Sequence, residues 1–196
     1  MTRTDCLRLA LLASTALSAV PALAGDKLPT GASVAHGSVD VSTPAANAMA
    51  IRQSSDTAIV NWQGFSIGEG ARVDISQPST SSAMLNRVTG STPSSIAGQL
   101  NANGQVYLIN PNGIAITPTG TVRTGAFVAS TLATTDEDFI AGRRSFHGKG
   151  RSAAVVNQGS IEVGPGGYAA LIGGKVDNSG QITARLGTIG LGAGRR

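Results

Sequence analysis

An internal repeat with a period of about 21 residues constrains the fold of this chain more than any other feature. The segment Val155-Val-Asn-Gln-Gly-Ser-Ile161 aligns with Val176-Asp-Asn-Ser-Gly-Gln-Ile182, so that the valines, asparagines, glycines and isoleucines pair. The same offset pairs three further positions: Gly166 with Gly187, Tyr168 with Ile189, and Ala170 with Leu191. A period of about this length, built from short strands and Gly/Asn turns, is typical of a β-solenoid.

The length of this repeat gives an estimate of the number of coils in the chain. After a leader of 24 residues, 172 residues remain, which at about 21 per coil predicts roughly eight coils and a rod on the order of 40 Å long. Gly120-Thr-Val122 resembles the start of the same turn and strand one or two coils earlier. Residues 134–152 break the period and are rich in charge, so we expect a loop or hairpin that projects from the rod.

Composition supports an all-β chain with one domain and a targeting segment. Glycine accounts for 26 of 196 residues, and short Val/Ile/Ala/Thr runs are frequent. The formal net charge is +4, or +3 once the leader is removed. No basic run with interleaved aromatic residues is present, so the sequence gives no indication of a nucleic-acid partner.

The N-terminus has the pattern of a secretory signal peptide over residues 1–24. Arg3 and Arg8 precede the apolar segment Leu9–Val20, and Ala22-Leu-Ala24 is a small-residue cleavage site that would expose Gly25. A membrane anchor is the alternative, but the apolar segment is short for a span. The only cysteine, Cys6, lies inside the leader, so the mature chain is expected to contain no disulfide.

A four-residue turn separates two apolar, β-favouring runs in Gln105-Val-Tyr-Leu-Ile-Asn-Pro-Asn-Gly-Ile-Ala-Ile116. Asn110 can bond its own backbone, Pro111 presets φ at the second turn position, and Asn112 and Gly113 tolerate the conformations that follow. Strand, tight turn and strand are therefore expected. Asn110 and Asn112 are expected to stabilise the turn and to stack with asparagines of neighbouring coils.

Several separated motifs occur in the order found in one family. They are Ile59-Val-Asn-Trp-Gln-Gly-Phe-Ser-Ile67, Gln77-Pro78, Leu85-Asn-Arg-Val-Thr-Gly90, Ser95-Ile-Ala-Gly-Gln-Leu100, Asn103-Gly-Gln-Val-Tyr-Leu-Ile-Asn-Pro-Asn-Gly-Ile114 and Ala129-Ser-Thr-Leu132. Over positions 35 to 194 the chain resembles the secretion domain (haemagglutination-activity or TPS domain) of two-partner-secretion exoproteins. This is the family of filamentous haemagglutinin and the high-molecular-weight adhesins. An Asn-Pro-Asn-Leu motif of the haemagglutinin type is absent, which favours the adhesin branch.

The resemblance implies a fold, a route and a partner. It implies a right-handed single-stranded parallel β-helix over residues 59–196, with an N-terminal cap at 25–58 and an extra-helical loop at 134–152. It also implies passage through the general secretory machinery and the periplasm. A cognate outer-membrane β-barrel transporter would then direct the chain to the cell surface or the medium. Family members run on into a long fibre, whereas this sequence stops at Arg196, so we expect that further coils once followed or still follow in a longer gene product.

The resemblance places the secretion motif at Asn110, Pro111, Asn112 and Gly113. Asn86 and Arg87 form a second candidate, because a charged residue between Leu85 and Val88 needs a partner or an exposed face. Contact with a transporter and a structural hydrogen-bonding role are both open for this pair. Trp62 and Phe65 are expected to pack in the core rather than to stack on a ligand.

The sequence contains few residues that could form a catalytic or metal site. Only His36 and His147 are available for a histidine-based site. Asp136, Glu137 and Asp138 suggest calcium, but we favour a solvated acidic turn that faces Arg143, Arg144, Lys149 and Arg151. We therefore expect no enzymatic activity, no catalytic residues, no metal and no cofactor.

Two alternative function classes remain. One is a free-standing β-helical adhesin or glycan-binding module, with host-cell or glycan receptors as partners. The other is a polysaccharide-active β-helix enzyme, for which Asp74 and Glu69 are the only carboxylates in a stretch otherwise poor in charge.

Overall fold

The computed structural model describes residues 28–148 and 153–194. The predicted leader, its cleavage site and Cys6 lie outside these residues. Apart from one short helix, the regular structure of the described residues is β-strand. No helix in these two ranges is long and apolar enough to cross a membrane.

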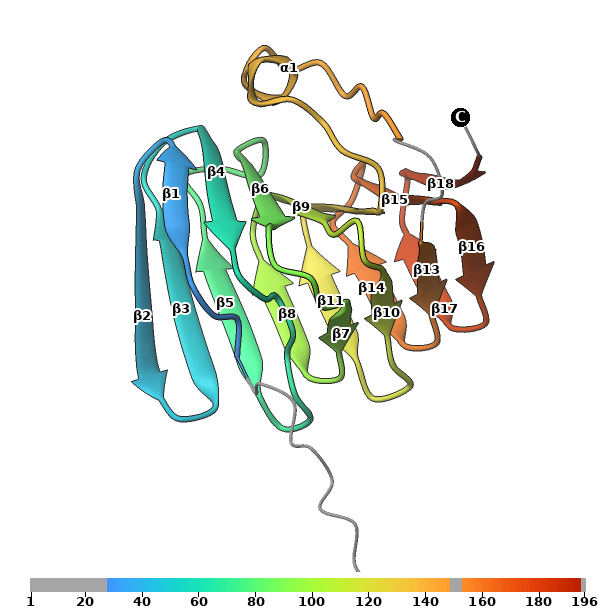
Figure 1. The fold of residues 1–196 in the computed structure, drawn as a ribbon, viewed down its shortest axis with the longest axis horizontal. Coiled ribbons are helices and arrows are strands. Elements are labelled where there is room, and N and C mark those ends of the chain that lie inside the picture. The colour runs from blue at the N-terminus through green and yellow to red at the C-terminus, as the bar shows by residue number, and fades with distance from the viewer. Residues whose placement is uncertain (1–27, 149–152, 195–196) are drawn as a thin grey trace, which may run out of the picture.

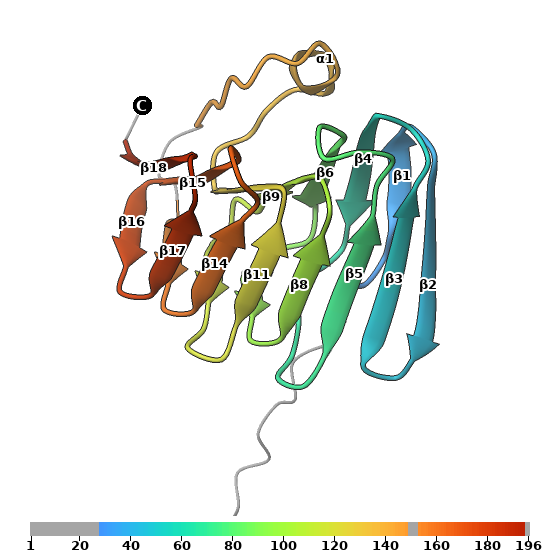
Figure 2. The ribbon, with the colours of Figure 1, turned by 180° about the vertical axis from the view of Figure 1, so that it is seen from behind.

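The strands form three sheets that run along one rod (Figures 1 and 2). In spatial order, sheet 1 contains β1 (Ser33–His36), β4 (Thr57–Trp62), β6 (Ala83–Val88), β9 (Gln105–Ile109), β12 (Ala126–Ser130), β15 (Tyr168–Gly173) and β18 (Thr188–Ala193). Sheet 2 contains β7 (Ser94–Ile96), β10 (Ile114–Ile116), β13 (Ala154–Asn157) and β16 (Lys175–Asn178). Sheet 3 contains β2 (Val39–Ala45), β3 (Ala48–Gln53), β5 (Arg72–Ser76), β8 (Gln99–Ala102), β11 (Thr121–Thr124), β14 (Ser160–Val163) and β17 (Gln181–Ala184).

From β6 onward the chain visits the three sheets in turn, which makes a right-handed parallel β-helix and confirms the predicted fold class. Strand β9 in sheet 1 is followed by β10 in sheet 2 and β11 in sheet 3, and β12 then pairs in parallel with β9. The strand that begins at Thr121 pairs with β14 and so lies one coil before the clear repeat.

The rod contains about six coils, so the prediction of eight was wrong. The prediction divided all 172 residues after the leader into coils of about 21, but three features of the structure leave fewer residues for such coils. The early coils are longer than the C-terminal repeat, since Thr57 pairs with Ala83, 26 positions later. Strands β1 and β2 pair antiparallel instead of coiling, and a long insertion separates β12 from β13.

The core is a narrow column of stacked apolar side chains inside the coils. One ladder in sheet 3 illustrates the stacking, with each side chain above its copy in the next coil: Met49, Val73, Leu100, Val122, Ile161 and Ile182. Trp62 and Phe65 are both buried and meet edge to face at 5.4 Å, which confirms their assignment to the core. Burial of such columns drives the stacking of repeats.

The repeat register changes before the last strand, so the offset of the aligned segments does not extend as far as predicted. Val155 pairs with Val176 and Ile161 with Ile182, as the alignment requires. In β18, however, Ile189 pairs with Ala169 instead of Tyr168, an offset of 20. The turn before β18 is one residue shorter than its copy, and it places Leu186 at φ +54°, in the left-handed region.

Antiparallel strands cover the N-terminal end of the rod. Strand β1 pairs antiparallel with β4 at the edge of sheet 1, and β2 folds back on β3 at the edge of sheet 3. Both lie on the first parallel coil, at the blue end of Figure 1. Pairing with these strands satisfies backbone groups that an open sheet edge would leave free.

An insertion between β12 and β13 leaves the coil and crosses the outer face of sheet 1 (Figure 1). We call residues 133–147 the strap, because reciprocal backbone hydrogen bonds between Ala133 and His147, at 2.9 and 2.7 Å, close its base. The strap contains the helix α1 (Asp136–Ile140). This insertion overlaps the loop expected at 134–152, and its helix folds back onto the rod through the buried Phe139.

Candidate functional site

The turn between β9 and β10 is built around the buried side chain of Asn110. The amide nitrogen of Asn110 donates to the carbonyl oxygen of Thr92 at 2.9 Å and to Ser94 Oγ at 3.0 Å. Its Oδ1 accepts from the backbone N–H of Asn112 at 2.9 Å and from Asn112 Nδ2 at 3.0 Å. Asn110 thus closes its own turn and ties that turn to the preceding coil.

The other three residues of the motif complete the turn. The backbone N–H of Gly113 donates to the Asn110 carbonyl oxygen at 3.1 Å, and Gly113 has a φ of +121°, which disfavours residues with a side chain. Asn112 Nδ2 also donates to the Gly90 carbonyl oxygen at 2.9 Å. Asn110 and Gly113 are buried, whereas Pro111 and Asn112 are exposed.

The expected stack of asparagines is found elsewhere. Asn110 bonds to Thr92 and Ser94 in the neighbouring coil instead of to another asparagine. Asparagines do stack at Asn157, whose Nδ2 donates to Asn178 Oδ1 at 2.7 Å. The repeat that pairs these two residues in the sequence is the signal that would have placed the stack correctly.

Asn86 points into the rod. Its Oδ1 accepts from the indole Nε1 of Trp62 at 3.0 Å, and its Nδ2 donates to the carbonyl oxygen of Tyr107 at 3.4 Å. The side chain is fully buried. In the folded domain Asn86 is therefore a partner for the buried indole and is closed to other molecules.

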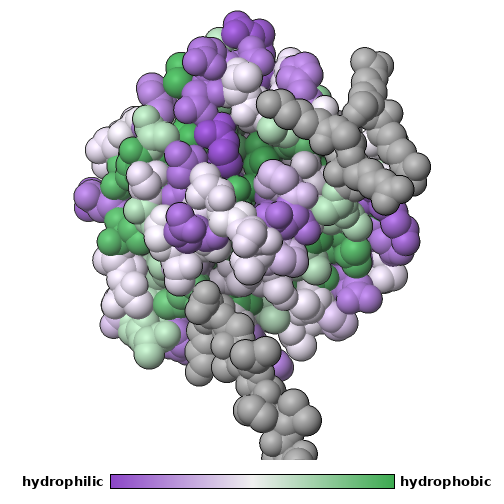
Figure 3. Space-filling model, viewed as in Figure 1, coloured by the Kyte–Doolittle hydropathy of each residue, from purple (hydrophilic) through white to green (hydrophobic). Residues whose placement is uncertain are grey.

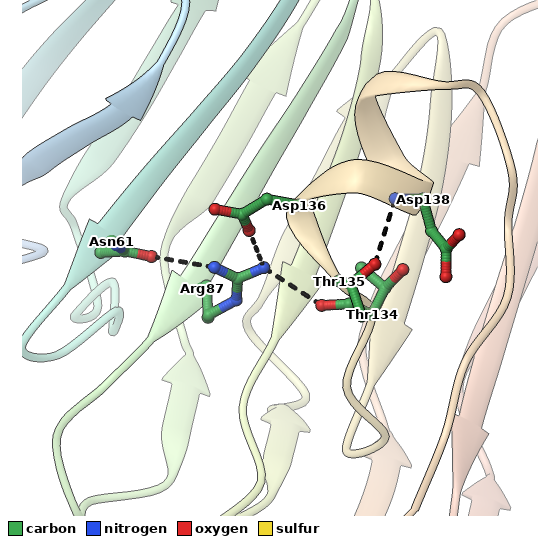
Figure 4. A network of polar contacts seen from close by, with 6 residues as sticks. All are labelled: Asn61, Arg87, Thr134, Thr135, Asp136 and Asp138. Carbon is green, nitrogen blue, oxygen red and sulfur yellow. Dashed lines mark hydrogen bonds and ion pairs between the residues drawn. The ribbon is translucent and has the colours of Figure 1, made fainter.

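Arg87, the next residue, points the opposite way and holds the strap (Figure 4). Its Nη2 donates to Asp136 Oδ1 at 2.6 Å and to the Thr134 carbonyl oxygen at 3.1 Å, while Nη1 donates to Asn61 Oδ1 at 3.4 Å. About a quarter of its side chain, 23 %, is exposed. Of the two roles left open for Arg87, the structure shows the hydrogen-bonding one.

The candidate residues therefore do not make one surface. Asn86, Asn110 and Gly113 are buried, and Arg87 is held against the strap on the outer face of sheet 1. Only Pro111 and Asn112 are openly accessible.

A second apolar cluster, which the sequence did not reveal, lies between the strap and sheet 1. Its buried members are Ile59, Ala83, Leu85, Tyr107, Ile109, Val128 and Phe139. Phe139 meets Tyr107 edge to face at 5.0 Å, and the Arg144 guanidinium lies 4.7 Å from the Phe139 ring and 4.9 Å from the Tyr107 ring. A strand with one exposed face alternates apolar and polar residues. In β9 the outward-facing Tyr107 and Ile109 are apolar like the inward-facing residues, so the sequence did not show that a second cluster covers the outer face.

Polar groups complete this cluster. The Tyr107 and Tyr168 hydroxyl groups are hydrogen-bonded to each other, and Gln105 Oε1 accepts from Tyr168 at 2.8 Å. Arg144 Nε donates to the Tyr107 hydroxyl oxygen at 2.7 Å. Burial raises the pKa of Tyr107 well above its ordinary value, and the bond to Tyr168 adds to the increase.

Two of the three acidic residues of the strap, Asp136 and Asp138, have basic partners. Asp136 pairs with Arg87, and Arg143 Nε donates to Asp138 Oδ1 at 2.6 Å, which lowers the pKa of that carboxyl group. The pair with Arg143 was anticipated, whereas the pair with Arg87 was not. Hydrophilic groups gather around α1 at the top of Figure 3. Among the described residues, no three His, Cys, Asp or Glu side chains lie close enough to hold a metal ion.

A shallow trough of about 1000 Å³ follows the outer face of sheet 3, which faces the viewer in Figure 2. Its lining includes the carboxylates of Asp40 and Asp74 and the guanidinium groups of Arg52 and Arg123. Asp74 bonds to Arg72 at 3.2 Å and to Asn101 at 2.8 Å, and Glu69 is not part of this trough. The two carboxylates considered for a polysaccharide-active enzyme are therefore not brought together there.

The fold and the site define a class of protein: a capped parallel β-helix with an extra-helical strap and a motif turn built into its core. The chain belongs to the TPS secretion domain family, which it matches over residues 26–196. It is a secretion domain of the two-partner-secretion exoproteins, as the sequence motifs predicted. Domains of this family direct export and are recognised by cognate outer-membrane transporters, and the exoproteins reach the cell surface or the medium.

Three known proteins illustrate the similarity. The crystal structure of the HMW1 secretion domain from Haemophilus influenzae matches with a TM-score of 0.79 and 39% identity, over 85% of this chain and 45% of that one. A heme/hemopexin-binding protein of H. influenzae strain Rd is 37% identical over 163 residues, which cover 80% of this chain and 18% of that protein. A second H. influenzae heme/hemopexin-binding protein is 40% identical over 95 residues, 48% of this chain and 10% of that protein. The chain thus spans less than a fifth of the length of these curated relatives.

Proposed function

We propose that the cognate transporter recognises the segment around Asn110-Pro-Asn-Gly113 while the chain is still extended in the periplasm. The observation that supports this proposal is the burial of Asn110 and Gly113 in the folded domain. A transporter cannot contact the Asn110 side chain once its amide bonds to Thr92, Ser94 and Asn112 have formed. Recognition of that side chain therefore precedes folding.

Folding outside the cell would then bias export. Parallel pairing between coils joins residues 20 or more positions apart, and such non-local pairing forms slowly. A slowly folding chain stays extended long enough to be threaded. Each coil formed at the surface then opposes return through the pore.

The remaining parts of the pathway are proposals of the same kind. The leader at residues 1–24 would take the chain through the general secretory machinery, and cleavage would leave Gly25 at the N-terminus. The exoprotein would be of the adhesin type, with host-cell or glycan receptors bound by regions beyond this domain, and the domain itself would have no enzymatic activity. The similarity to the HMW1 secretion domain supports the adhesin type.

Export in a Gram-negative host, with and without the cognate transporter, tests the proposal. We expect a product that begins at Gly25 to reach the medium only when the transporter is present. Release that does not depend on the transporter would contradict the proposal and would favour a free-standing β-helical binder. Retention in the periplasm in both cases would contradict it as well.

A matched pair of variants separates recognition from stability. Asn110→Ala and Asn157→Ala each remove a buried asparagine whose Oδ1 accepts from a backbone N–H two residues later. If the motif is recognised, Asn110→Ala blocks export and Asn157→Ala does not. Equal export of the two variants would show that fold stability, and not recognition of the motif, controls secretion.

A further inference from the structure

The strap connects coils that do not touch one another. It leaves the rod after β12 and reaches back toward the N-terminal coils, where Arg87 of β6 bonds to Asp136 and Thr134. Arg87 also bonds to Asn61 of β4, so the residue that holds the strap is itself held by the first strand of the parallel stack. Phe139 then packs on Tyr107 of β9.

The same cluster needs a strand that follows the strap in the sequence. Tyr168, Ala170 and Ile172 of β15 pack against the cluster from the other side. Ala126 of β12 lies between Gln105 and Tyr168 in the pairing register, and its small side chain lets these two residues meet above it at 2.8 Å. The cluster is therefore complete only when β15 is in place.

Arg144 joins the two halves. It donates to the Tyr107 hydroxyl oxygen at 2.7 Å and to the Phe139 carbonyl oxygen at 3.1 Å, with its guanidinium group over both rings. The Tyr107 hydroxyl group is bonded in turn to Tyr168. One connected set of contacts thus runs from the strap through β9 to β15.

Contacts of this kind change how cooperatively a rod of repeats unfolds. In a solenoid each coil contacts only its neighbours, so stability is close to a sum of local terms and the ends can unfold separately. The strap bonds to β6 and β9 and packs in one apolar cluster with residues of β4 and β15, so it adds stabilising terms between coils that are not neighbours. These terms penalise states in which only part of the rod is folded.

We propose that the strap is a closing device that locks the coils from β4 to β15 into one cooperative unit, and that it docks only once β15 has joined the rod. The strap is then the last part of this region to become fixed. This inference concerns the folded domain alone and does not depend on recognition by a transporter.

Unfolding of the purified domain, followed at both ends of the unit, tests the lock. Trp62 is the only tryptophan, so its fluorescence reports on β4, and amide exchange of β15 reports on the other end. In the wild-type domain we expect one denaturant transition for both probes. In Phe139→Ala we expect two transitions, with β15 amides exchanging about a hundredfold faster.

Ile140→Ala is the matched control, because Ile140 is the exposed neighbour of Phe139 on α1. It should leave a single transition. If Phe139→Ala does not fold, Tyr168→Phe removes the hydroxyl link and keeps the ring, and the two probes should again separate. Coincident transitions in Phe139→Ala, or in Tyr168→Phe where Phe139→Ala does not fold, would overturn the proposed lock.

The order of docking has its own readout. During refolding, pulsed amide exchange should show that the Ala133 N–H, which bonds to His147, is protected no earlier than the Leu171 N–H of β15. Protection of Ala133 before β15 would refute the order. Protection at the same time or later would support it.

Discussion

At the scale of single residues, the interior of the rod contains polar side chains whose hydrogen bonds are satisfied within the fold. Gln77 Nε2 donates to Gln53 Oε1 at 3.0 Å and to the Ser82 carbonyl oxygen at 3.1 Å, while its Oε1 accepts from the Gly104 N–H at 3.0 Å. Asn86 and Asn110 are satisfied in the same way. A buried amide stabilises only the register in which its partners are aligned. These residues thus specify how one coil sits on the next.

We expect Asn110→Ala to lower the free energy of unfolding by about 2–3 kcal/mol, because it leaves buried partners at Thr92 and Ser94 without their hydrogen bonds. Asn112→Ala should cost about 1 kcal/mol, since that side chain is exposed. Urea unfolding followed by Trp62 fluorescence measures both values. Equal costs for the two variants would contradict the central position of Asn110.

Tyr107 gives the domain a pH dependence in the alkaline range. Its folded-state pKa lies above the ordinary value of 10.0 because the hydroxyl group is buried and bonded to Tyr168. The folded state therefore binds this proton more tightly than the unfolded state does. The resulting stability is fully present below pH 10 and is lost as the pH rises through the folded-state pKa.

The decrease above pH 10 should approach about 1.4 kcal/mol per pH unit for one such group. Urea unfolding of the wild-type domain and of Tyr107→Phe, at a series of alkaline pH values, isolates the contribution of Tyr107. The variant should show a smaller slope. Identical slopes would mean that Tyr107 titrates in the same range in both states.

At the scale of elements, the sequence predicted the turns and stacked strands that depend on neighbouring residues, but not the contacts between distant segments. The Asn110–Gly113 turn and the stacked strands around Val155 and Val176 follow from turn residues and from the C-terminal repeat. The strap was expected only as a projecting loop, because the contact between Phe139 and Tyr107 joins residues 32 positions apart in different coils. No period in the sequence encodes such a contact.

The candidate site shows the same division. Sequence motifs selected Asn86 and Arg87 together, but the alternation of a strand sends one side chain to the indole of Trp62 and the other to the strap. Which of the two faces is buried depends on tertiary structure. The one-residue shortening of the turn before β18 was equally invisible, since the glycines at 166 and 187 align well at an offset of 21.

Leu186 carries the strain of that shorter turn. Its φ of +54° strains the backbone, and its side chain is 96% exposed, so no apolar burial offsets that strain. We expect Leu186→Gly to stabilise the last coil by about 1 kcal/mol. Amide exchange in β17 and β18 measures the effect, and Arg185→Gly in the same turn is the control. Faster exchange in Leu186→Gly than in the wild type would contradict this account.

At the scale of the whole molecule, the two ends of the described rod differ. Antiparallel strands cover the first coil, whereas β16, β17 and β18 have no partner on their outer edges among residues 28–148 and 153–194. Core-facing side chains are exposed at this second end, including Ile189 at 46% and Leu191 at 54%. Unpaired edges next to apolar side chains favour association with another strand.

We therefore expect the 196-residue chain to associate through its last coil as its concentration rises. Leu191 pairs in register with the buried Leu171, so its exposed side faces the position that a further coil would occupy. Leu191→Lys places a charge on that surface and should shift the weight-average mass toward the monomer, as measured by analytical ultracentrifugation. Val34→Lys, at the exposed N-terminal end, is the matched control and should leave the association unchanged. If association persists in Leu191→Lys and is lost in Val34→Lys, the contact lies at the capped N-terminal end. The open strand edges of the last coil would then not cause the association.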